Sequence, residues 1–329
     1  MEDLQRLIPI PIVWDSLARV EERLLEAAAA DDPYLTKIAQ HLLLAGGKRF
    51  RPLLALLAAE FGHTRDHRPT EAGVSVELIH VGSLYHDDVI DEADTRRGAA
   101  SVNANWTNTV AILAGDFLMA RASEVAATHL SQESVRLLAA TYADLVQGQT
   151  RELQLDFDLE HDVKDYEQVI AGKTASLIRT SARLGALASD APVAVVESLS
   201  NWAWEVGMVF QIADDALDLV ADGETIGKPA GSDIREGKFT MPVLEALIGP
   251  DGPRVRELLE SDHPYPDSVV NEVIDIVRAG GHIETALTEA RRRLEIASDA
   301  LTGLPDVEAR KVMETLGSYL LERVDAAKN

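Results

Sequence analysis

The sequence predicts an all-α protein, folded as a single large helical bundle over residues 1–329. Apolar residues recur at spacings of three and four, as at Leu17, Val20 and Leu24, and this period is typical of helices with one buried face. The alternating β-branched pattern of strands is scarce. Hydrophobic residues make up 46% of the chain, which is enough for a sizeable core.

Glycine, proline and aspartate divide the helical pattern into roughly ten or more helices with mostly short connections. The apolar spacing continues at Leu138 and Leu145 in the middle of the chain and at Leu294 and Leu301 near its end. No linker stands out, so we expect one domain. The breaks are expected at residues 31–33, 46–47, 61–69, 97–98, 159–165, 190–192, 222–237, 249–253, 262–267 and 279–281.

The composition excludes several classes of function. The formal net charge is −24, and binding to phosphate backbones or anionic lipid needs a basic face, so we expect no nucleic-acid partner. The absence of cysteine excludes disulfides, zinc–thiolate sites and thiol catalysis. The N-terminus lacks a signal-peptide pattern, and no uncharged run approaches the ~18–20 residues of a membrane span. We therefore expect a cytoplasmic protein without stable membrane insertion.

Two acidic clusters in apolar helical sequence have the same spacing, i, i+1 and i+4: Asp87, Asp88 and Asp91, and Asp214, Asp215 and Asp218. This spacing puts the first and last carboxylates on one helix face, with the middle one at its edge. Like charges so placed oppose helix formation and are costly to bury, so the repetition indicates that something positive lies between the clusters. Mg²⁺ with bound phosphate is the simplest candidate, because it takes carboxylate oxygens and completes its shell with waters and substrate. We expect a central cleft lined by both clusters.

Cationic residues accompany the clusters. His80 lies on the helical stripe of the first cluster, and Arg96 and Arg97 follow that cluster. Lys48 and Arg51 adjoin a Gly-Gly turn at a helix start, which is a reasonable anion site. Taken singly, these features also fit a basic helix end or a tight turn with solvated cations.

Two further cationic features lie in the second half of the chain. The Gly-rich stretch 222–237 carries Lys228 and precedes Lys238, and such a loop can fold over phosphate. A plain surface loop is the alternative. Because a single lysine inside a helix usually lies on the surface, Lys173, beside Thr174, would by itself be interpreted as a surface residue.

Together these residues resemble the trans-isoprenyl diphosphate synthase family, also called polyprenyl synthetases, over nearly the whole chain. The resemblance implies the isoprenoid synthase fold and a trans-prenyltransferase. Such an enzyme joins an allylic diphosphate to isopentenyl diphosphate, head to tail, and releases pyrophosphate, which accepts the proton. The motifs that carry the resemblance, in the family's order and spacing, are residues 46–52, 87–91 with 96–98, 115–117, 148–149, 173–174, 210–218 and 227–229.

The resemblance also implies roles for individual residues and a homodimer. Three Mg²⁺ ions are expected per active site: two on Asp87 and Asp91 with Asp88 in support, and one on Asp214 with Asp215 and Asp218 in support. The six aspartates and Lys173 would form the catalytic set. Isopentenyl diphosphate would be bound by Lys48, Arg51, His80 and Arg97. The allylic diphosphate or its metal shell would be bound by Arg96, Lys173, Thr174, Gln211, Lys228 and Lys238.

We expect residues near the first cluster to determine the length of the product. In the family, bulk at the fourth and fifth positions before that cluster blocks the product tunnel, and here these positions are Ser83 and Gly82. Leu78 lies a turn deeper, and Leu138 on the facing helix is a candidate floor. An open upper tunnel favours successive condensations to a long all-trans polyprenyl diphosphate (about C30–C50), such as heptaprenyl to nonaprenyl.

Among the alternative functions, a shorter-chain synthase and the catalytic subunit of a two-component synthase stay open, whereas a terpene cyclase and a non-catalytic subunit are disfavoured. A shorter-chain farnesyl or geranylgeranyl diphosphate synthase results if another residue closes the tunnel. A class I terpene cyclase usually replaces the second Asp cluster with an Asn/Ser/Glu motif and has no need for Lys48, Arg51 and His80. A non-catalytic subunit usually has damaged clusters, whereas the intact ones here leave open the catalytic subunit of a two-component synthase.

Overall fold

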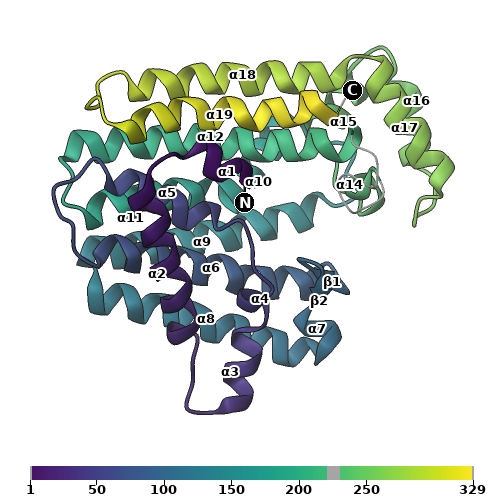
Figure 1. Ribbon diagram of the computed structural model, residues 1–329. Coiled ribbons are helices and arrows are strands. Elements are labelled where there is room, and N and C mark those ends of the chain that lie inside the picture. Colours follow the sequence, from purple (N-terminus) through teal and green to yellow (C-terminus); the bar gives the residue numbers. More distant parts are fainter. Residues whose placement is uncertain (1, 221–229, 328–329) are drawn as a thin grey trace. The chain divides into compact units, whose positions relative to one another are not determined.

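The computed structural model, which describes residues 2–220 and 230–327, is built almost entirely of helices and confirms the all-α class (Figure 1). Contacts within the chain divide it into two compact units. The first comprises residues 1–142, 177–200 and 303–312, and the second comprises residues 143–176, 201–302 and 313–329. The single domain expected from the sequence stays a prediction.

The first unit contains the N-terminal helices and the described hairpin, in which Thr95 pairs with Ala100 and Arg96 with Ala99. Its elements are α1 (Glu2–Leu7), α2 (Pro11–Ala27), α3 (Pro33–Ala39), α4 (His41–Leu44), α5 (Phe50–Ala59), α6 (Arg68–Ile90), β1 (Thr95–Arg96), β2 (Ala99–Ala100), α7 (Val102–Asn105) and α8 (Asn108–His129). Nearly all of α11 (Ser176–Ala188) also belongs to this unit.

Three long helices contribute residues to both units: α9 (Gln132–Leu155), α12 (Val193–Val220) and α19 (Glu308–Ala327). The second unit also holds α10 (Val163–Ile170), the π-helix η1 (Ala171–Ala175), α14 (Ser232–Arg235), α15 (Met241–Ile248), α16 (Gly252–Leu259), α17 (Asp267–Ala279) and α18 (His282–Leu301). The hairpin and the break between α18 and α19 were not expected from the sequence.

Helix α6 is the centre of the first unit. It packs against α2, α5 and α8 (Figure 1), so almost every side chain from Thr70 to Gly82 is buried. Its sequence accordingly lacks a polar face. Tyr85 is fully buried, and its hydroxyl donates to the carbonyl of Ile38 at 2.7 Å. The C-terminal end of α6 is thereby held firmly, and this end carries the first acidic cluster.

Helices α6 and α8 approach closely at two glycines. A Cβ placed on Gly82 would lie 3.0 Å from Met119 Cε and 3.1 Å from the carbonyl oxygen of Gly115. The expectation that Gly82 faces an open tunnel is therefore wrong, because α8 fills that space and the contact itself needs glycine. Ser83 beside it is half-buried.

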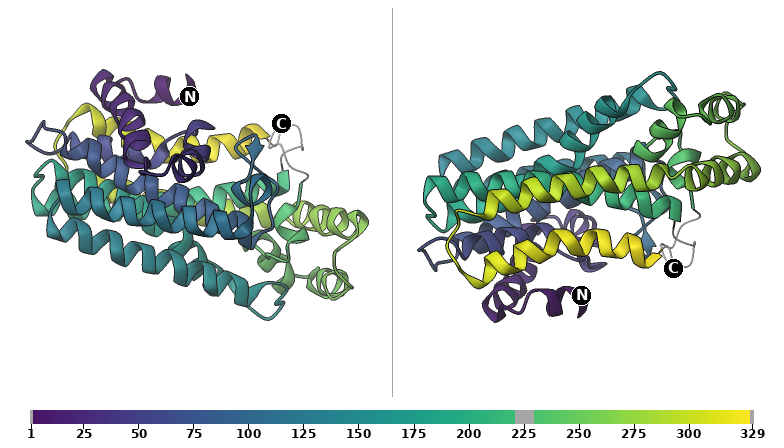
Figure 2. Two further views of the ribbon diagram at one scale, coloured as in Figure 1. Left: turned by 90° about the horizontal axis from the view of Figure 1, so that it is seen from below. Right: turned by 90° about the horizontal axis from the view of Figure 1, so that it is seen from above.

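In the second unit, α18 packs along α15 and α17 (Figure 2). Arg293 of α18 is almost fully buried and reaches two other helices. It binds Glu205 of α12 at 3.0 Å and Glu167 of α10 at 2.6 Å. This ion-pair cluster holds α10 near α12, the helix that carries the second acidic cluster.

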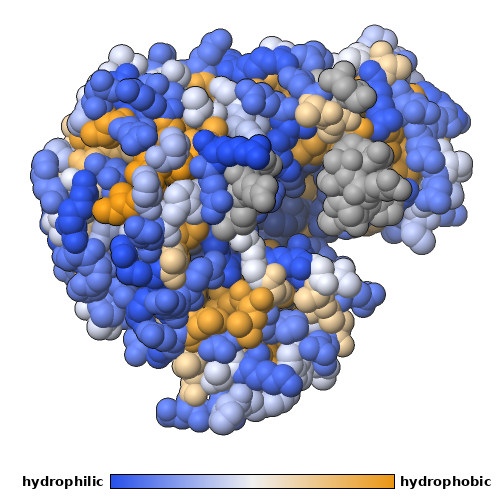
Figure 3. All heavy atoms as spheres, in the orientation of Figure 1, coloured by the Kyte–Doolittle hydropathy of each residue, from blue (hydrophilic) through white to orange (hydrophobic). Residues whose placement is uncertain are grey.

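The face drawn in Figure 3 is mostly hydrophilic, with hydrophobic residues in small separate groups, as expected for so acidic a chain. In the part of the chain that the structure describes, no helix combines the length and hydrophobicity needed to cross a membrane.

Candidate active site

The first acidic cluster lies at the C-terminal end of α6. Asp91 is the residue that ends the helix, and its N–H donates to the carbonyl of Asp87 at 2.8 Å. Asp91 is exposed, Asp87 is half-buried and Asp88 is fully buried. Because the C-terminal end of a helix carries partial negative charge, carboxylates there are unfavourable without a cation.

Arg96 of the hairpin binds the buried member of this cluster. Its Nε and Nη2 atoms lie 2.7 and 2.6 Å from Asp88 Oδ1. Burial raises the pKa of Asp88, and Arg96 opposes that shift. Asp88 Oδ2 is buried and has no hydrogen-bond partner, which leaves one oxygen for a cation or a water.

Glu77 is the buried centre of a cationic cluster in the first unit. Its Oε1 lies 3.0 Å from Arg49 Nη1 and 3.7 Å from Arg97 Nη2. Burial raises the pKa of Glu77, whereas Arg49, Arg97 and Arg51 lower it. The sequence analysis did not identify Glu77, although it precedes His80 by three positions and so lies on the same helix stripe.

Arg49 shapes the turn that precedes α5. Its backbone is left-handed, with φ of 48°, and its guanidinium is buried against Glu21, Glu77 and the carbonyl of Gly46. Arg49 is thus a structural residue between two predicted diphosphate contacts. Lys48 before it is exposed, and Arg51 lies in the first turn of α5.

Arg51, Arg97 and His80 lie close enough to affect one another's protonation. Burial lowers the pKa of Arg51 to about 10, and Arg97 adds to this effect, so Arg51 stays charged at neutral pH. Burial, Arg51 and Arg97 hold the pKa of His80 well below its usual value, so His80 is neutral there. The fold therefore gathers three of the four residues predicted for isopentenyl diphosphate around Glu77.

The second acidic cluster lies in the last two turns of α12. Asp214 is exposed, whereas Asp215 is buried. Tyr166 Oη donates to Asp215 Oδ2 at 2.5 Å, and Gln211 Nε2 donates to Asp215 Oδ1 at 2.8 Å. Burial raises the pKa of Asp215 to about 7, against the effect of these two donors. Both Asp215 oxygens thus have protein partners.

Two residues predicted for the allylic diphosphate contact each other. Thr174 Oγ1 donates to Gln211 Oε1 at 2.7 Å, so both ends of the Gln211 amide have protein partners. Tyr166, which the sequence analysis missed, precedes Lys173 by seven residues. That spacing is two helical turns and would have placed Tyr166 on the Lys173 face.

Asp218 anchors two residues of the Gly-rich stretch. Its carboxylate accepts the N–H groups of Ser232 at 3.2 Å and Asp233 at 3.4 Å. Asp233 is a further acid beside the cluster, and burial together with Asp215 and Asp218 raises its pKa well above the usual value. Asp218 therefore has a structural task beyond the metal support expected of it.

The structure describes two of the three remaining cations predicted in the second unit. Lys238 Nζ lies 2.7 Å from Glu236. Lys228 lies outside the described residues. Lys173 is presented by the π-helix η1, and its Nζ lies 2.5 Å from Glu152, a second carboxylate missed by the sequence analysis. Short π-helices often occur at functional sites.

Two glycines allow η1 to approach α9. A Cβ on Gly148 would lie 2.6 Å from the backbone nitrogen of Lys173, and one on Gly172 would lie 2.9 Å from the carbonyl oxygen of Asp144. This close contact brings Glu152, one turn further along α9, within reach of Lys173.

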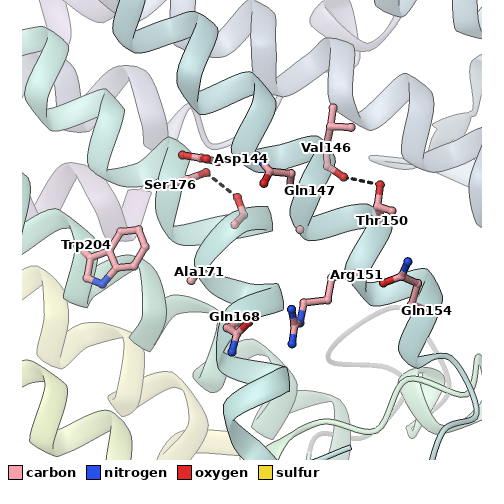
Figure 4. A pocket seen from close by; sticks show the side chains of 12 residues that line it. Asp144, Val146, Gln147, Thr150, Arg151, Gln154, Gln168, Ala171, Ser176 and Trp204 are labelled. Atoms are coloured by element: carbon pink, nitrogen blue, oxygen red, sulfur yellow. Dashed lines mark hydrogen bonds between the residues drawn. The ribbon is translucent and has the colours of Figure 1, made fainter.

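A pocket of about 540 Å³ opens beside this contact, among α9, α10, η1 and Trp204 (Figure 4). Arg151 lies on its wall and forms a 2.5 Å ion pair with Asp165. None of the six predicted catalytic aspartates lines this pocket.

Within residues 2–220 and 230–327, no three His, Asp or Glu side chains form a group that could hold a metal ion. This arrangement fits Mg²⁺, which is usually bound by one or two carboxylates with waters and substrate phosphates completing its shell. Asp88 has one unpartnered buried oxygen, and Asp87, Asp91 and Asp214 are the more accessible acids of the two clusters.

Comparison with known proteins identifies the class. The polyprenyl synthetase family model matches residues 32–277. Nonaprenyl diphosphate synthase of Mycobacterium tuberculosis is 42% identical over 98% of this chain and 96% of its own. Heptaprenyl diphosphate synthase component 2 of Geobacillus stearothermophilus is 40% identical over 94% and 96%. The crystal structure of geranylgeranyl pyrophosphate synthase from Corynebacterium glutamicum, complexed with calcium and isoprenyl diphosphate, is 39% identical, has a TM-score of 0.84, and covers 95% of this chain and 96% of its own.

The helical fold and its two acidic clusters agree with this class of enzyme. This chain belongs to the polyprenyl synthetase family. It is an enzyme, a trans-prenyltransferase with the isoprenoid synthase fold.

Proposed function

We propose that this enzyme condenses an allylic diphosphate with isopentenyl diphosphate, head to tail, in successive Mg²⁺-dependent rounds. The observation that carries the proposal is the pair of acidic clusters at helix C-terminal ends, with Arg96 and Arg51 close to the first cluster. Relatives named as polyprenyl diphosphate synthases support it. A relative whose crystal structure contains calcium and isoprenyl diphosphate supports the use of a divalent cation.

Three Mg²⁺ ions would be held by Asp87, Asp91 and Asp214. When bound, they would neutralise the negative charge that develops on the pyrophosphate leaving group. Asp88 and Asp215 would support these ligands indirectly. Asp88 would do so through its bond with Arg96, and Asp215 through its bonds with Tyr166 and Gln211. Asp218 would fix the chain that leads to Lys238.

The cationic cluster of the first unit would bind isopentenyl diphosphate. Arg51 and Arg97 supply charge, Lys48 is exposed on the adjacent turn, and neutral His80 supplies a hydrogen bond. Glu77 would keep the arginines in place while offsetting part of their repulsion. The orientation of the substrate double bond then favours coupling.

The allylic diphosphate would be bound in the second unit by Lys173 and Lys238. In the structure their partners are Glu152 and Glu236. These acids would hold the cations in position until the substrate arrives. Lys228 is proposed for the same role from the sequence alone.

A long-chain product is proposed from the small residue at Ser83 and from the nonaprenyl and heptaprenyl relatives. The geranylgeranyl relative keeps the shorter-chain alternative open. Leu78 and Leu138, both buried, would lie deeper along the chain path. Ser83→Phe should shorten the product while the first condensation stays near the wild-type rate, with Ser83→Ala as control. Gly82→Phe is a poor test, because its ring would meet α8.

A homodimer is proposed on the basis of an exposed apolar face on α8, where Ile112 is 44% and Leu113 is 60% exposed. Leu113→Glu should therefore yield monomers in sedimentation, whereas Ile248→Glu, a still more exposed control on α15 (78%), should not. A dimeric Leu113→Glu variant would refute this assignment.

The decisive experiment is an assay of the purified chain alone with Mg²⁺, isopentenyl diphosphate and an allylic primer, with product length read by chromatography. Activity of the chain alone supports the proposal. The name of the Geobacillus relative, component 2, makes a two-component synthase the second candidate. Activity that appears only with a separate partner would favour that candidate, and a cyclic product would favour a terpene cyclase.

A further inference from the structure

Tyr166 lies at one end of a hydrogen-bonded chain that links three elements of the second unit. The chain runs from Tyr166 of α10 to Asp215 of α12, then to Gln211 one turn earlier, and then to Thr174 of η1. The three contacts measure 2.5, 2.8 and 2.7 Å. Tyr166 and Asp215 are buried, so the bond between them does not compete with bulk water.

The two ends of this chain flank the residues that do the chemistry. Asp215 is the neighbour of Asp214, and Thr174 is the neighbour of Lys173. Tyr166 and Lys173 belong to one continuous helical segment, because η1 follows α10 without a gap. A displacement of α10 relative to α12 would therefore change the position of Lys173 relative to Asp214.

We propose that Tyr166 is a positioning residue, whose hydroxyl holds the Asp215 carboxylate so that Asp214 and Lys173 keep the spacing needed for a metal-bound diphosphate. This inference rests on the proposed function and assigns a role to a residue outside the acidic clusters. Without the hydroxyl, Asp215 Oδ2 would be a buried oxygen without a donor. The carboxylate would then turn towards another donor or cation, or α10 would shift.

The test compares Tyr166→Phe with Tyr265→Phe. Tyr265 is also a buried tyrosine of the second unit, and its hydroxyl donates to the carbonyl of Leu259 at 2.8 Å, with no acid of the cluster involved. Both variants lose one buried hydroxyl, so general loss of stability affects both. The measurements are the Mg²⁺ concentration for half-maximal rate, kcat and KM for each substrate, and the rise in melting temperature caused by Mg²⁺ with inorganic pyrophosphate.

For Tyr166→Phe we expect the Mg²⁺ midpoint to rise about tenfold, as for other residues that orient metal ligands. We also expect a lower kcat, an unchanged KM for isopentenyl diphosphate, and a smaller thermal rise with Mg²⁺ and pyrophosphate. Tyr265→Phe should match the wild type in the Mg²⁺ midpoint, in kcat, in the KM for isopentenyl diphosphate and in the thermal rise. In an Asp215→Asn background, Tyr166→Phe should add little, because the two residues act as one unit.

The inference is overturned if Tyr166→Phe keeps the wild-type Mg²⁺ midpoint and thermal rise. It is also overturned if its effects equal those of Tyr265→Phe, or if they add fully to those of Asp215→Asn. Failure of the proposed function would look different, because the wild-type enzyme itself would then show no Mg²⁺-dependent condensation.

Discussion

The two acidic clusters have one spacing in sequence, but the fold holds their buried middle residues in different ways. Asp88 of the first cluster is paired with a positive charge, Arg96, which is 28% exposed. Asp215 of the second is held by two neutral donors, Tyr166 and Gln211. Burial raises the pKa of both carboxyls.

The two clusters differ in the groups that offset the negative charge of the buried carboxylate. In the first cluster an arginine already neutralises the buried acid, so that the outer carboxylates can hold a metal. In the second cluster burial raises the pKa of Asp215 to about 7, and the two neutral donors only partly oppose that shift. The second cluster thus depends more on a bound cation or proton. The following predictions test that contrast, from the largest expected effect to the smallest.

The largest effect is expected from the accessible aspartates. Asp87→Ala and Asp214→Ala should each lower kcat by roughly 100- to 1,000-fold, because each removes a ligand that stabilises the leaving group, worth about 3–4 kcal/mol. Circular dichroism should show an intact fold. Asp15→Ala and Asp275→Ala, exposed acids of the two units, are the controls. Near-normal rates for either cluster variant at saturating Mg²⁺ would show that its cluster holds no essential metal.

The two units should also differ in substrate. Arg51→Ala should raise the KM for isopentenyl diphosphate roughly tenfold or more, since a charge-assisted hydrogen bond is lost, and should change the KM for the allylic primer far less. Lys173→Ala should do the reverse. Steady-state kinetics with each substrate varied in turn decides the matter, and equal effects on both substrates would contradict the division of roles.

The middle aspartates should differ in stability. With metal removed by EDTA at pH 7.5, Asp88→Asn should cost about 1–2 kcal/mol in urea unfolding, because it leaves Arg96 without its partner. Asp215→Asn should cost less, or stabilise the protein. The raised pKa of Asp215 means that the native state holds its ionised form less favourably than the unfolded chain does. A greater loss for Asp215→Asn would reverse the comparison.

The smallest effect is a pH dependence in the cationic cluster of the first unit. His80 has a depressed pKa, through burial and the charges of Arg51, Arg97, Arg49 and Arg96, so it is neutral in the native state. Below its ordinary pKa of 6.5 the unfolded chain binds a proton that the native protein does not. Stability should therefore be lost as the pH falls, by up to about 1.4 kcal/mol per pH unit.

Urea unfolding between pH 7.5 and 5.5 measures this loss. His80→Gln should remove this part of the pH dependence, whereas the control His129→Gln, at the end of α8, should keep it. If the free energy of unfolding of His80→Gln fell with pH as steeply as that of the wild type, His80 would be protonated in the native state.

The helical class and the motif residues could be read from the sequence because they are local properties. Apolar spacing of three and four fixes helices, and the Asp spacing places carboxylates on one face whatever surrounds them. The Gly-Gly turn before Arg51 was likewise local. The sequence also suggested which cations accompany which acids, since Arg96 and Arg97 lie within a few residues of Asp91.

Only the tertiary structure decided how these residues are held. Glu77, Glu152 and Tyr166 are buried or half-buried polar residues whose partners come from other helices, and no periodicity reveals such a partner. Gly82 looked like open space in the sequence, but α8 fills that space. The sequence by itself thus predicted the helices, the enzyme family and the candidate metal-binding acids. The packing of separate helices determined which acids are neutralised and which stay accessible, because burial and hydrogen bonding depend on neighbours that are distant along the chain.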